Sequence, residues 1–388
     1  MRARQRTIPV TALRRFLESE AAAGVLLMAS AALALAIANS PLGPAYRALF
    51  ALRLGPLTLL QWINDAAMAG FFLLVGLEIK RELLIGHLRR WSARILPGAG
   101  ALGGMVAPAL IYLAVNASPG GAPRGWAVPA ATDIAFALGV LALLGPRAPA
   151  SLKVFVTALA ILDDLGAAAI IGLFYSERLL WGALLAAGVV LALVCLLGRY
   201  ERRAVAPYLS LGAAVWAFVL ASGVHPTLAG VLLAAVTPMN AEDEEASPLH
   251  LMERKLAGPV AFVVLPLFGF ANAGVDFSGA AAGLGPVFWG VAAGLFIGKP
   301  LGVFSGMMLA VRAGLATRPQ GARLKQTFGA CALCGVGFTM SLFIGDIAFG
   351  ADAARAFQTK MGVLLGSLSA IALGASVLWD RPKRTGGD

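Results

Sequence analysis

The feature that most constrains this chain is a series of apolar runs of about 20 residues, each separated from the next by a short polar break. A helix of about 20 residues crosses the hydrocarbon core of a bilayer, where backbone polar groups must be satisfied internally. Hydrophobic residues make up 59% of the 388 residues and charged residues only 13%, against roughly 25% in soluble domains. The sequence therefore predicts an all-α, polytopic membrane protein.

The apolar runs predict twelve transmembrane helices, and no soluble domain interrupts them, so we expect a single membrane domain over 1–388. The expected spans are 18–40, 59–84, 95–116, 121–143, 150–175, 179–199, 205–221, 223–236, 249–271, 286–311, 326–350 and 357–379.

The distribution of basic residues predicts the orientation of these spans. Most of the 31 Lys and Arg residues fall in one set of alternating loops, and by the positive-inside rule that set faces the cytoplasm. Both termini are then cytoplasmic, and the stretch 45–58, with Gly55 and Pro56, is external. Its alternating pattern favours a short β-hairpin or an ordered loop. The net charge of +11 does not indicate nucleic-acid binding, because the cations lie in loops between spans.

Two of the expected spans are interrupted. The fourth carries Pro129 just before Thr132 and Asp133, and the eleventh carries Gly335 and Gly337. These spans are the middle members of two triplets, 95–175 and 286–379, that enter the membrane from opposite sides. The pattern predicts inverted three-helix repeats with two discontinuous helices, the arrangement in which transporters place their sites.

Four ionisable residues fall at mid-membrane, where each costs about 3 kcal/mol and is a functional candidate. They are Asp133, Asp163, Asp164 and Lys299. Adjacent helix positions point about 100° apart, so Asp163 and Asp164 face different surroundings. We expect Lys299 to pair with Asp163 or to bind exposed carbonyl groups. For Asp133 we favour compensation of helix-end partial charges over direct ion binding.

Asp164, with Asp163 and the Thr132 hydroxyl, offers the oxygen ligands that a small alkali cation accepts. Burial favours the neutral form of a carboxyl group, so the same oxygens can hold a proton or a cation, but not both. That competition is itself an exchange mechanism. The alternative is a buried ion-pair network that serves packing alone.

Other charged residues lie nearer the membrane faces. Asp65 falls toward the external end of the second span. Glu78, Arg81 and Glu82 fall near its cytoplasmic end, where they line an entry funnel or simply form an interfacial charged end. His225 precedes Pro226 in a turn, and it is either a pH-responsive group or a plain turn residue.

The cysteines do not indicate a metal or disulfide framework. Cys331 and Cys334 have CxxC spacing, but the sequence has no second pair to complete a zinc site. We therefore expect no cofactor, and membrane lipid as the surrounding medium.

With the motifs "GLEIKREL", "TDIAFALG", "ILDDLGA" and "GKPLG", the chain resembles the NhaA family of bacterial Na⁺/H⁺ antiporters over nearly its whole length. The resemblance implies a protein of the bacterial inner membrane with crossed broken helices and a cytoplasmic funnel. It also implies a homodimer formed through the external hairpin near 45–58, and electrogenic exchange of more protons than sodium ions.

The resemblance implies a role for each candidate residue. Asp163 and Asp164 bind Na⁺ and protons, while Asp133 and Lys299 compensate charge. The residues implied in the pH response are Glu78, Arg81, Glu82, Glu253 and His225.

We therefore expect a pH-regulated secondary transporter that uses the proton gradient to expel Na⁺ and Li⁺ by alternating access, and not an enzyme. A sodium-coupled solute symporter is the first alternative, but few polar residues exist to bind an organic substrate. An intramembrane aspartyl protease is the second, although it needs its two aspartates on facing helices.

Overall fold

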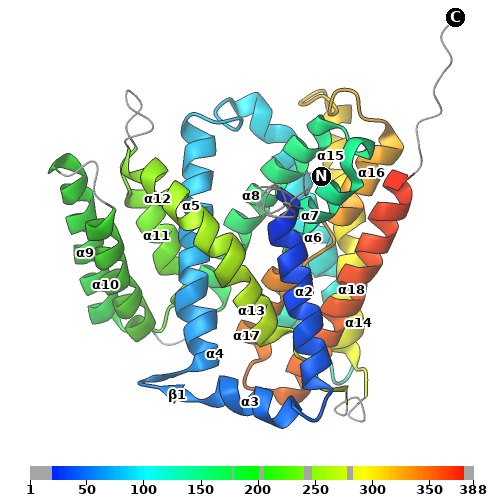
Figure 1. Cartoon of the computed structure of the whole chain (residues 1–388). Coiled ribbons are helices and arrows are strands. Elements are labelled where there is room, and N and C mark those ends of the chain that lie inside the picture. The colour runs from blue at the N-terminus through cyan, green and yellow to red at the C-terminus, as the bar shows by residue number, and fades with distance from the viewer. Residues whose placement is uncertain (1–19, 177–178, 201–204, 240–246, 278–282, 380–388) are drawn as a thin grey trace, which may run out of the picture.

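The computed structural model describes residues 20–176, 179–200, 205–239, 247–277 and 283–379 (Figure 1). The two termini that we expect in the cytoplasm, 1–19 and 380–388, lie outside the described residues. Nearly every described element is helical, as predicted, and one small two-stranded sheet joins the first helices.

The chain begins with α2 (Glu20–Ala38), α3 (Gly43–Ala51), β1 (Arg53–Leu54), β2 (Leu57–Thr58), α4 (Leu59–Gln61), the π-helical turn η1 (Trp62–Ala67), α5 (Met68–Leu84) and α6 (Trp91–Val115). The middle comprises the 3₁₀ segment η2 (Pro123–Ala130), α7 (Ile134–Leu144), the 3₁₀ turn η3 (Gly145–Arg147), α8 (Ala150–Phe174), α9 (Trp181–Tyr200), α10 (Ala206–Ser222) and α11 (Leu228–Val236). The remainder comprises α12 (Pro248–Pro259), the π turn η4 (Val260–Val264), α13 (Leu265–Asn272), α14 (Pro286–Ala293), the π turn η6 (Gly294–Gly298), α15 (Lys299–Arg312), α16 (Leu324–Leu333), α17 (Phe338–Phe349) and α18 (Ala353–Trp379).

The lengths and hydropathy of these helices support a polytopic membrane protein. Within the described ranges, eight helical segments are long and apolar enough to cross a membrane, and two bent pairs raise the number to at most ten. These pairs are α2 with α3, bent by 113°, and α16 with α17, bent by 41°. At 17 and 9 residues, α10 and α11 are shorter than these segments. The total of twelve spans stays a prediction.

Three helix starts differ from those predicted by four or more residues: α6 begins at Trp91, before the predicted 95, and the other two have a local reason. The eighth predicted span, 223–236, becomes helical only at Leu228, because Gly223 adopts a left-handed φ of 82° and Pro226 follows it. The twelfth begins at Ala353, four residues earlier than predicted. There the Asp352 side chain accepts a hydrogen bond from the Arg355 N–H at 3.0 Å, a cap that the apolar pattern does not reveal.

Only part of the predicted stretch 45–58 forms a hairpin, residues 53–58, because Gly43–Ala51 is the helix α3. β1 and β2 pair antiparallel, with Arg53 opposite Thr58 and Leu54 opposite Leu57. Gly55 supplies the positive φ, 71°, that a two-residue turn requires. The Thr58 hydroxyl then caps α4 by accepting a hydrogen bond from the Gln61 N–H. The end of the molecule that carries these strands is called the hairpin end below (Figure 1).

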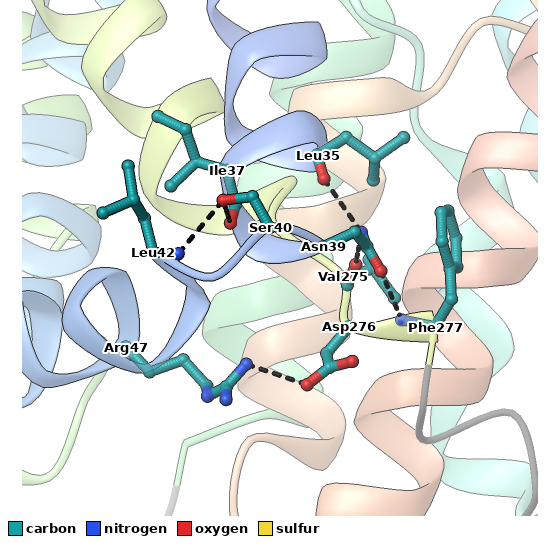
Figure 2. A network of polar contacts seen from close by, with 9 residues as sticks. All are labelled: Leu35, Ile37, Asn39, Ser40, Leu42, Arg47, Val275, Asp276 and Phe277. Atoms are coloured by element: carbon teal, nitrogen blue, oxygen red, sulfur yellow. Dashed lines mark hydrogen bonds and ion pairs between the residues drawn. The ribbon is translucent and has the colours of Figure 1, made fainter.

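A network of polar contacts ties the α2–α3 connection to the segment that follows α13 (Figure 2). The Asn39 amide donates to Val275 O at 2.7 Å and accepts from Phe277 N–H at 2.8 Å. Arg47 on α3 forms an ion pair with Asp276 at 2.8 Å. These contacts fix α3 and the attached strands against the helical core.

The helices divide into two packed groups (Figure 1). One group contains α6, α14, α15, α16 and α18, which contact one another extensively. The other contains α5, α9, α10, α11 and α12. The broken segments η2–α7 and α16–α17 lie with the first group, and α17 also contacts α13.

Candidate functional site

The interruptions in the two broken segments contact each other directly. Residues 131–133 separate η2 from α7, and 334–337 separate α16 from α17. Thr132 donates its hydroxyl hydrogen to Cys334 O at 2.9 Å, and Asp133 N–H donates to Val336 O at 2.7 Å. Each interruption thus uses backbone groups that the other has freed from helical bonding.

Glycine at the eleventh span's interruption permits this close approach. A Cβ atom at Gly335 would lie 2.4 Å from Leu295 O, and one at Gly337 would lie 3.1 Å from Ala131 O. Gly335 thus lets this interruption pack against the backbone of η6, and Gly337 lets it approach residue 131 of the other interruption.

Asp133 lies at the start of two helices. As the N-cap of α7, its Oδ1 accepts from Phe136 N–H at 2.9 Å. Its Oδ2 accepts from Thr339 N–H, at the first turn of α17, at 3.0 Å, and also from the Thr339 hydroxyl. Because a helix N-terminus carries partial positive charge, this carboxylate offsets two such ends at once. The geometry matches the compensating role that we favoured from the sequence.

Lys299 pairs with Asp163, as predicted. Its Nζ lies 2.7 Å from Asp163 Oδ2, and both side chains are fully buried. The same Nζ also donates to Ala130 O, at the end of η2. The ammonium group therefore satisfies one carboxylate and one exposed helix-end carbonyl. Lys299 directly follows the π turn η6, a backbone irregularity that the apolar pattern does not signal.

Asp164 is the exception in this charged cluster. It is 1% exposed, and within the part of the chain that the structure describes neither of its oxygens has a hydrogen-bond partner. Asp163 Oδ1 is also without a partner among these residues. The charges of Asp163, Asp133, Lys299 and Glu78 act on Asp164. An unpaired buried carboxylate is costly, so it marks a place where a proton or a cation is expected.

The residues predicted near the cytoplasmic end of the second span form a second cluster at the far end of α5 from the hairpin. Arg81 lies 3.3 Å from Glu82 and 3.1 Å from Glu253, which belongs to α12. The charge of Glu253 also acts on Glu78. Beside them, a cavity of about 260 Å³ is lined by Glu82, His87 and residues of α8. The structure thus brings Glu78, Arg81, Glu82 and Glu253 together.

His225 is not part of that cluster. Its Nε2 lies 3.8 Å from Asp65 Oδ1, and its Nδ1 lies 2.8 Å from the Thr227 hydroxyl. Asp65 belongs to η1, which follows the hairpin closely, so both residues lie toward the hairpin end. The structure separates His225 from the four residues with which the resemblance grouped it.

Sequence reasoning missed three polar residues near Asp65. Asn64 and Asn272 exchange amide hydrogen bonds at 3.3 and 2.8 Å, and Asn64 also donates to Asp346 at 2.9 Å. The charge of Asp346 acts on Asp65. The hydrogen-bond partners of these residues are more than 200 positions away in the sequence, so no local pattern pairs them. The one signal in the sequence is that Asn64, Asn272 and Asp346 are polar residues among apolar neighbours.

The described residues contain no group of three or more His, Cys, Asp or Glu side chains that could hold a metal ion. Cys331 and Cys334 are buried and free, and Cys195 is exposed. The oxygens available at the crossing are those of Asp163, Asp164 and Thr132, which suit a hard monovalent cation bound in transit.

Apolar helices with two interruptions that cross beside buried charges are the arrangement of a secondary transporter. The family model described as "Na+/H+ antiporter 1" matches residues 14–378. The chain belongs to this family of membrane transporters.

Relatives that carry the name Na(+)/H(+) antiporter NhaA are similar over nearly their whole lengths. The protein of Rhizorhabdus wittichii is 58% identical over 369 residues, covering 94% of this chain and 97% of its own. That of Paramagnetospirillum magneticum is 55% identical over 372 residues, covering 95% and 97% respectively. That of Bordetella parapertussis is 55% identical over 381 residues, covering 94% and 96%.

Proposed function

We propose that this protein exchanges Na⁺ or Li⁺ for protons across the bacterial inner membrane. The observation that carries the proposal is Asp164, a buried carboxylate without a hydrogen-bond partner in the described structure, next to the ion-paired Asp163. Family membership and the names of the relatives support the same activity. No cofactor and no organic substrate are part of this proposal.

In the proposed mechanism, the free oxygens of Asp164 and Asp163 hold either protons or one cation. The Thr132 oxygen is the candidate third ligand. When a cation enters, it replaces the carboxyl protons, and protonation from the other side expels it. Exchange of more protons than monovalent cations would move net charge, so the proposed transport is electrogenic.

Alternating access would present this site to one side of the membrane at a time. We propose that the triplets 95–175 and 286–379 are inverted repeats within one twelve-span domain and move against the other helices around the site. During this movement, Asp133 and Lys299 would compensate the partial charges at the helix ends that meet at the crossing.

We assign the hairpin end to the outside of the cell and both termini to the cytoplasm, following the basic loops. The cluster of Glu78, Arg81, Glu82 and Glu253 then lines the cytoplasmic entry and contributes to pH regulation. Asp65 and His225 belong to the external pathway. The exposed hairpin near 45–58 is the proposed contact of a homodimer, surrounded by lipid.

Dissipation of an imposed pH gradient by added Na⁺ in proteoliposomes tests the function. We expect the wild-type protein to exchange and Asp164→Asn to be inactive. Exchange that persists in Asp164→Asn would place the ion elsewhere. Sodium flux that ignores the pH gradient would indicate a channel, and sodium flux that requires an organic solute would indicate a symporter.

A further inference from the structure

At the hairpin end, a polar contact joins the two packed groups of helices. Asp346 Oδ2 on α17 accepts from the Asn64 amide on η1 at 2.9 Å. The Asn64 amide is bonded in turn to that of Asn272 on α13, and Asn272 also donates to Phe268 O at 3.0 Å. Asn64 and Asn272 are almost completely buried. We call Asn64, Asn272 and Asp346 the hairpin-end latch.

Asp346 also lines a cavity at this end of the molecule. This cavity of about 510 Å³ is lined by Asp346 together with Arg124, Asp352 and Arg355. The next described layer toward the crossing is aromatic and centres on Phe343, which is fully buried. Its ring centre lies 5.2 Å from that of His225, 5.6 Å from that of Phe72 and 6.2 Å from that of Phe268. The latch thus lies between an open polar cavity and a dry layer.

The helix α17 connects the latch to the candidate ion site. Thr339, in its first turn, is bonded to Asp133 at the crossing. Asp346 lies seven residues further along, which is about two turns or 10 Å on the same face of the helix. Displacement of α17 at one of these contacts therefore acts on the other. Near the hairpin end, α17 and α13 lie side by side (Figure 1).

Resting on the proposed function, we propose that the Asn64–Asp346 hydrogen bond is a positioning contact that stabilises the state closed at the hairpin end. Asp346 belongs to the second triplet, whereas Asn64 and Asn272 belong to helices outside both triplets. Opening at the hairpin end requires these groups to separate, so the bond must break once per transport cycle. A hydrogen bond to a charged group stabilises one of two states enough to shift their populations about tenfold or more.

The chain allows the latch to be tested apart from the charge of Asp346. Asp346→Ala and Asn64→Ala each break the bond, whereas Asp346→Asn removes the charge but keeps an oxygen that can accept from Asn64. The matched control is Asp276→Ala, which removes a carboxylate at the same end but from the Arg47 ion pair on the surface (Figure 2).

We would measure the KM for Na⁺ from each face, in everted and right-side-out vesicles. We expect Asp346→Ala and Asn64→Ala to lower the KM from the hairpin side and raise it from the other, changing the ratio about tenfold or more. The double variant should change it no further than Asn64→Ala alone, because Asn64→Ala already removes the bond to Asp346 together with those to Asn272. Asp276→Ala should keep the wild-type ratio, and Asp346→Asn, which can still form a neutral hydrogen bond, should change it less than Asp346→Ala does.

Three results would overturn the latch. The first is an unchanged ratio of the two KM values in both alanine variants, which would mean that the hydrogen bond has only a structural role. The second is a defect in Asp346→Asn as large as in Asp346→Ala, which would mean that the charge itself carries ions. The third is additive effects in the double variant. Should Asp346→Ala not fold, Asn64→Ala breaks the same bond.

Hydrogen exchange in the purified protein gives a reading that does not depend on transport. We expect amides of η1 and α17 to exchange faster in both alanine variants, and to be affected less in Asp346→Asn, which can still form a neutral hydrogen bond. Unchanged protection in the alanine variants overturns the latch. If the wild-type protein does not exchange ions, the proposed function is wrong. The amide exchange rates would still show whether the Asn64–Asp346 hydrogen bond stabilises the hairpin end.

Discussion

The charged residues at the helix crossing and those at the far end of α5 have opposite surroundings. At the crossing, Asp133, Asp163, Asp164 and Lys299 are at most 2% exposed, and every one except Asp164 has a hydrogen-bond or ion-pair partner. In the other cluster, the side chains are partly exposed, Arg81 to 32%, Glu253 to 15% and Glu82 to 13%, and Arg81 contacts both glutamates. Solvent screens charges near the surface more strongly than charges in the interior, so the interactions at the crossing are expected to be the stronger ones.

The comparison explains why two adjacent aspartates behave differently. Asp163 and Asp164 share one helix and nearly the same depth, but only Asp163 faces Lys299. The pair combines a carboxylate that is held in place with one that is free to exchange its ligand. In the partly exposed cluster, by contrast, Arg81 pairs with both Glu82 and Glu253.

The largest effect is expected from Asp164→Asn, which should reduce sodium-dependent proton movement to that of protein-free liposomes. Asparagine has nearly the same shape but cannot exchange a proton for a cation. Because Asp164 makes no hydrogen bond within the described structure, we expect little loss of thermal stability. A comparable loss of activity in Glu82→Gln would show that the two regions do not differ as we describe.

The next largest effect is expected from Lys299→Met. Removing one member of a buried ion pair leaves the other uncompensated and typically costs about 3–5 kcal/mol. Here it also leaves the Ala130 carbonyl without its donor. Chemical unfolding in detergent measures the loss, and a second substitution, Asp163→Asn, should recover part of it. A double variant as unstable as the sum of both single variants would contradict the pairing.

An intermediate effect is expected from Asp133→Ala. The substitution removes the acceptor for the Phe136 and Thr339 amides, and an unsatisfied buried group costs about 1–3 kcal/mol. We expect a lower melting temperature and a lower maximal rate, with the apparent Na⁺ affinity within about twofold of wild type. An affinity loss as large as that of Asp164→Asn would make Asp133 an ion ligand instead.

The smallest effect is expected from Arg81→Gln, because Arg81, at 32% exposed, is the most exposed side chain in its ion pairs with Glu82 and Glu253. Ion pairs in contact with solvent contribute about 0–1 kcal/mol, and salt weakens them further. The free energy of unfolding should therefore change by less than about 1 kcal/mol, and the difference should shrink at high ionic strength. A loss as large as that of Lys299→Met would show that Arg81 is effectively buried.

Much of this architecture was predictable because apolar length and charge are local properties of the sequence. The second and fifth predicted spans, 59–84 and 150–175, agree with the helices to within one residue. Pro129 and Gly335 marked the two interruptions, because proline and glycine weaken helices wherever they occur. The Asp163–Lys299 pair followed from the shortage of other mid-membrane charges.

Other features depend on tertiary contacts and could not be predicted. The π turn η6 before Lys299 leaves no trace in the apolar pattern. The bond between Asn64 and Asp346 joins residues 282 positions apart, and no local rule pairs them. The predicted topology placed His225 near the turn between the seventh and eighth spans, but its contact with Asp65 could not be predicted.

The central claim is that the buried carboxylates hold either a proton or a cation, and proton release on binding tests it most directly. Calorimetric titration of the purified protein with Li⁺ or Na⁺, in two buffers with different ionisation enthalpies, counts the protons released. We predict release of more than one proton per bound cation in the wild-type protein, and no binding in Asp164→Asn. Cation binding without proton release would contradict the account.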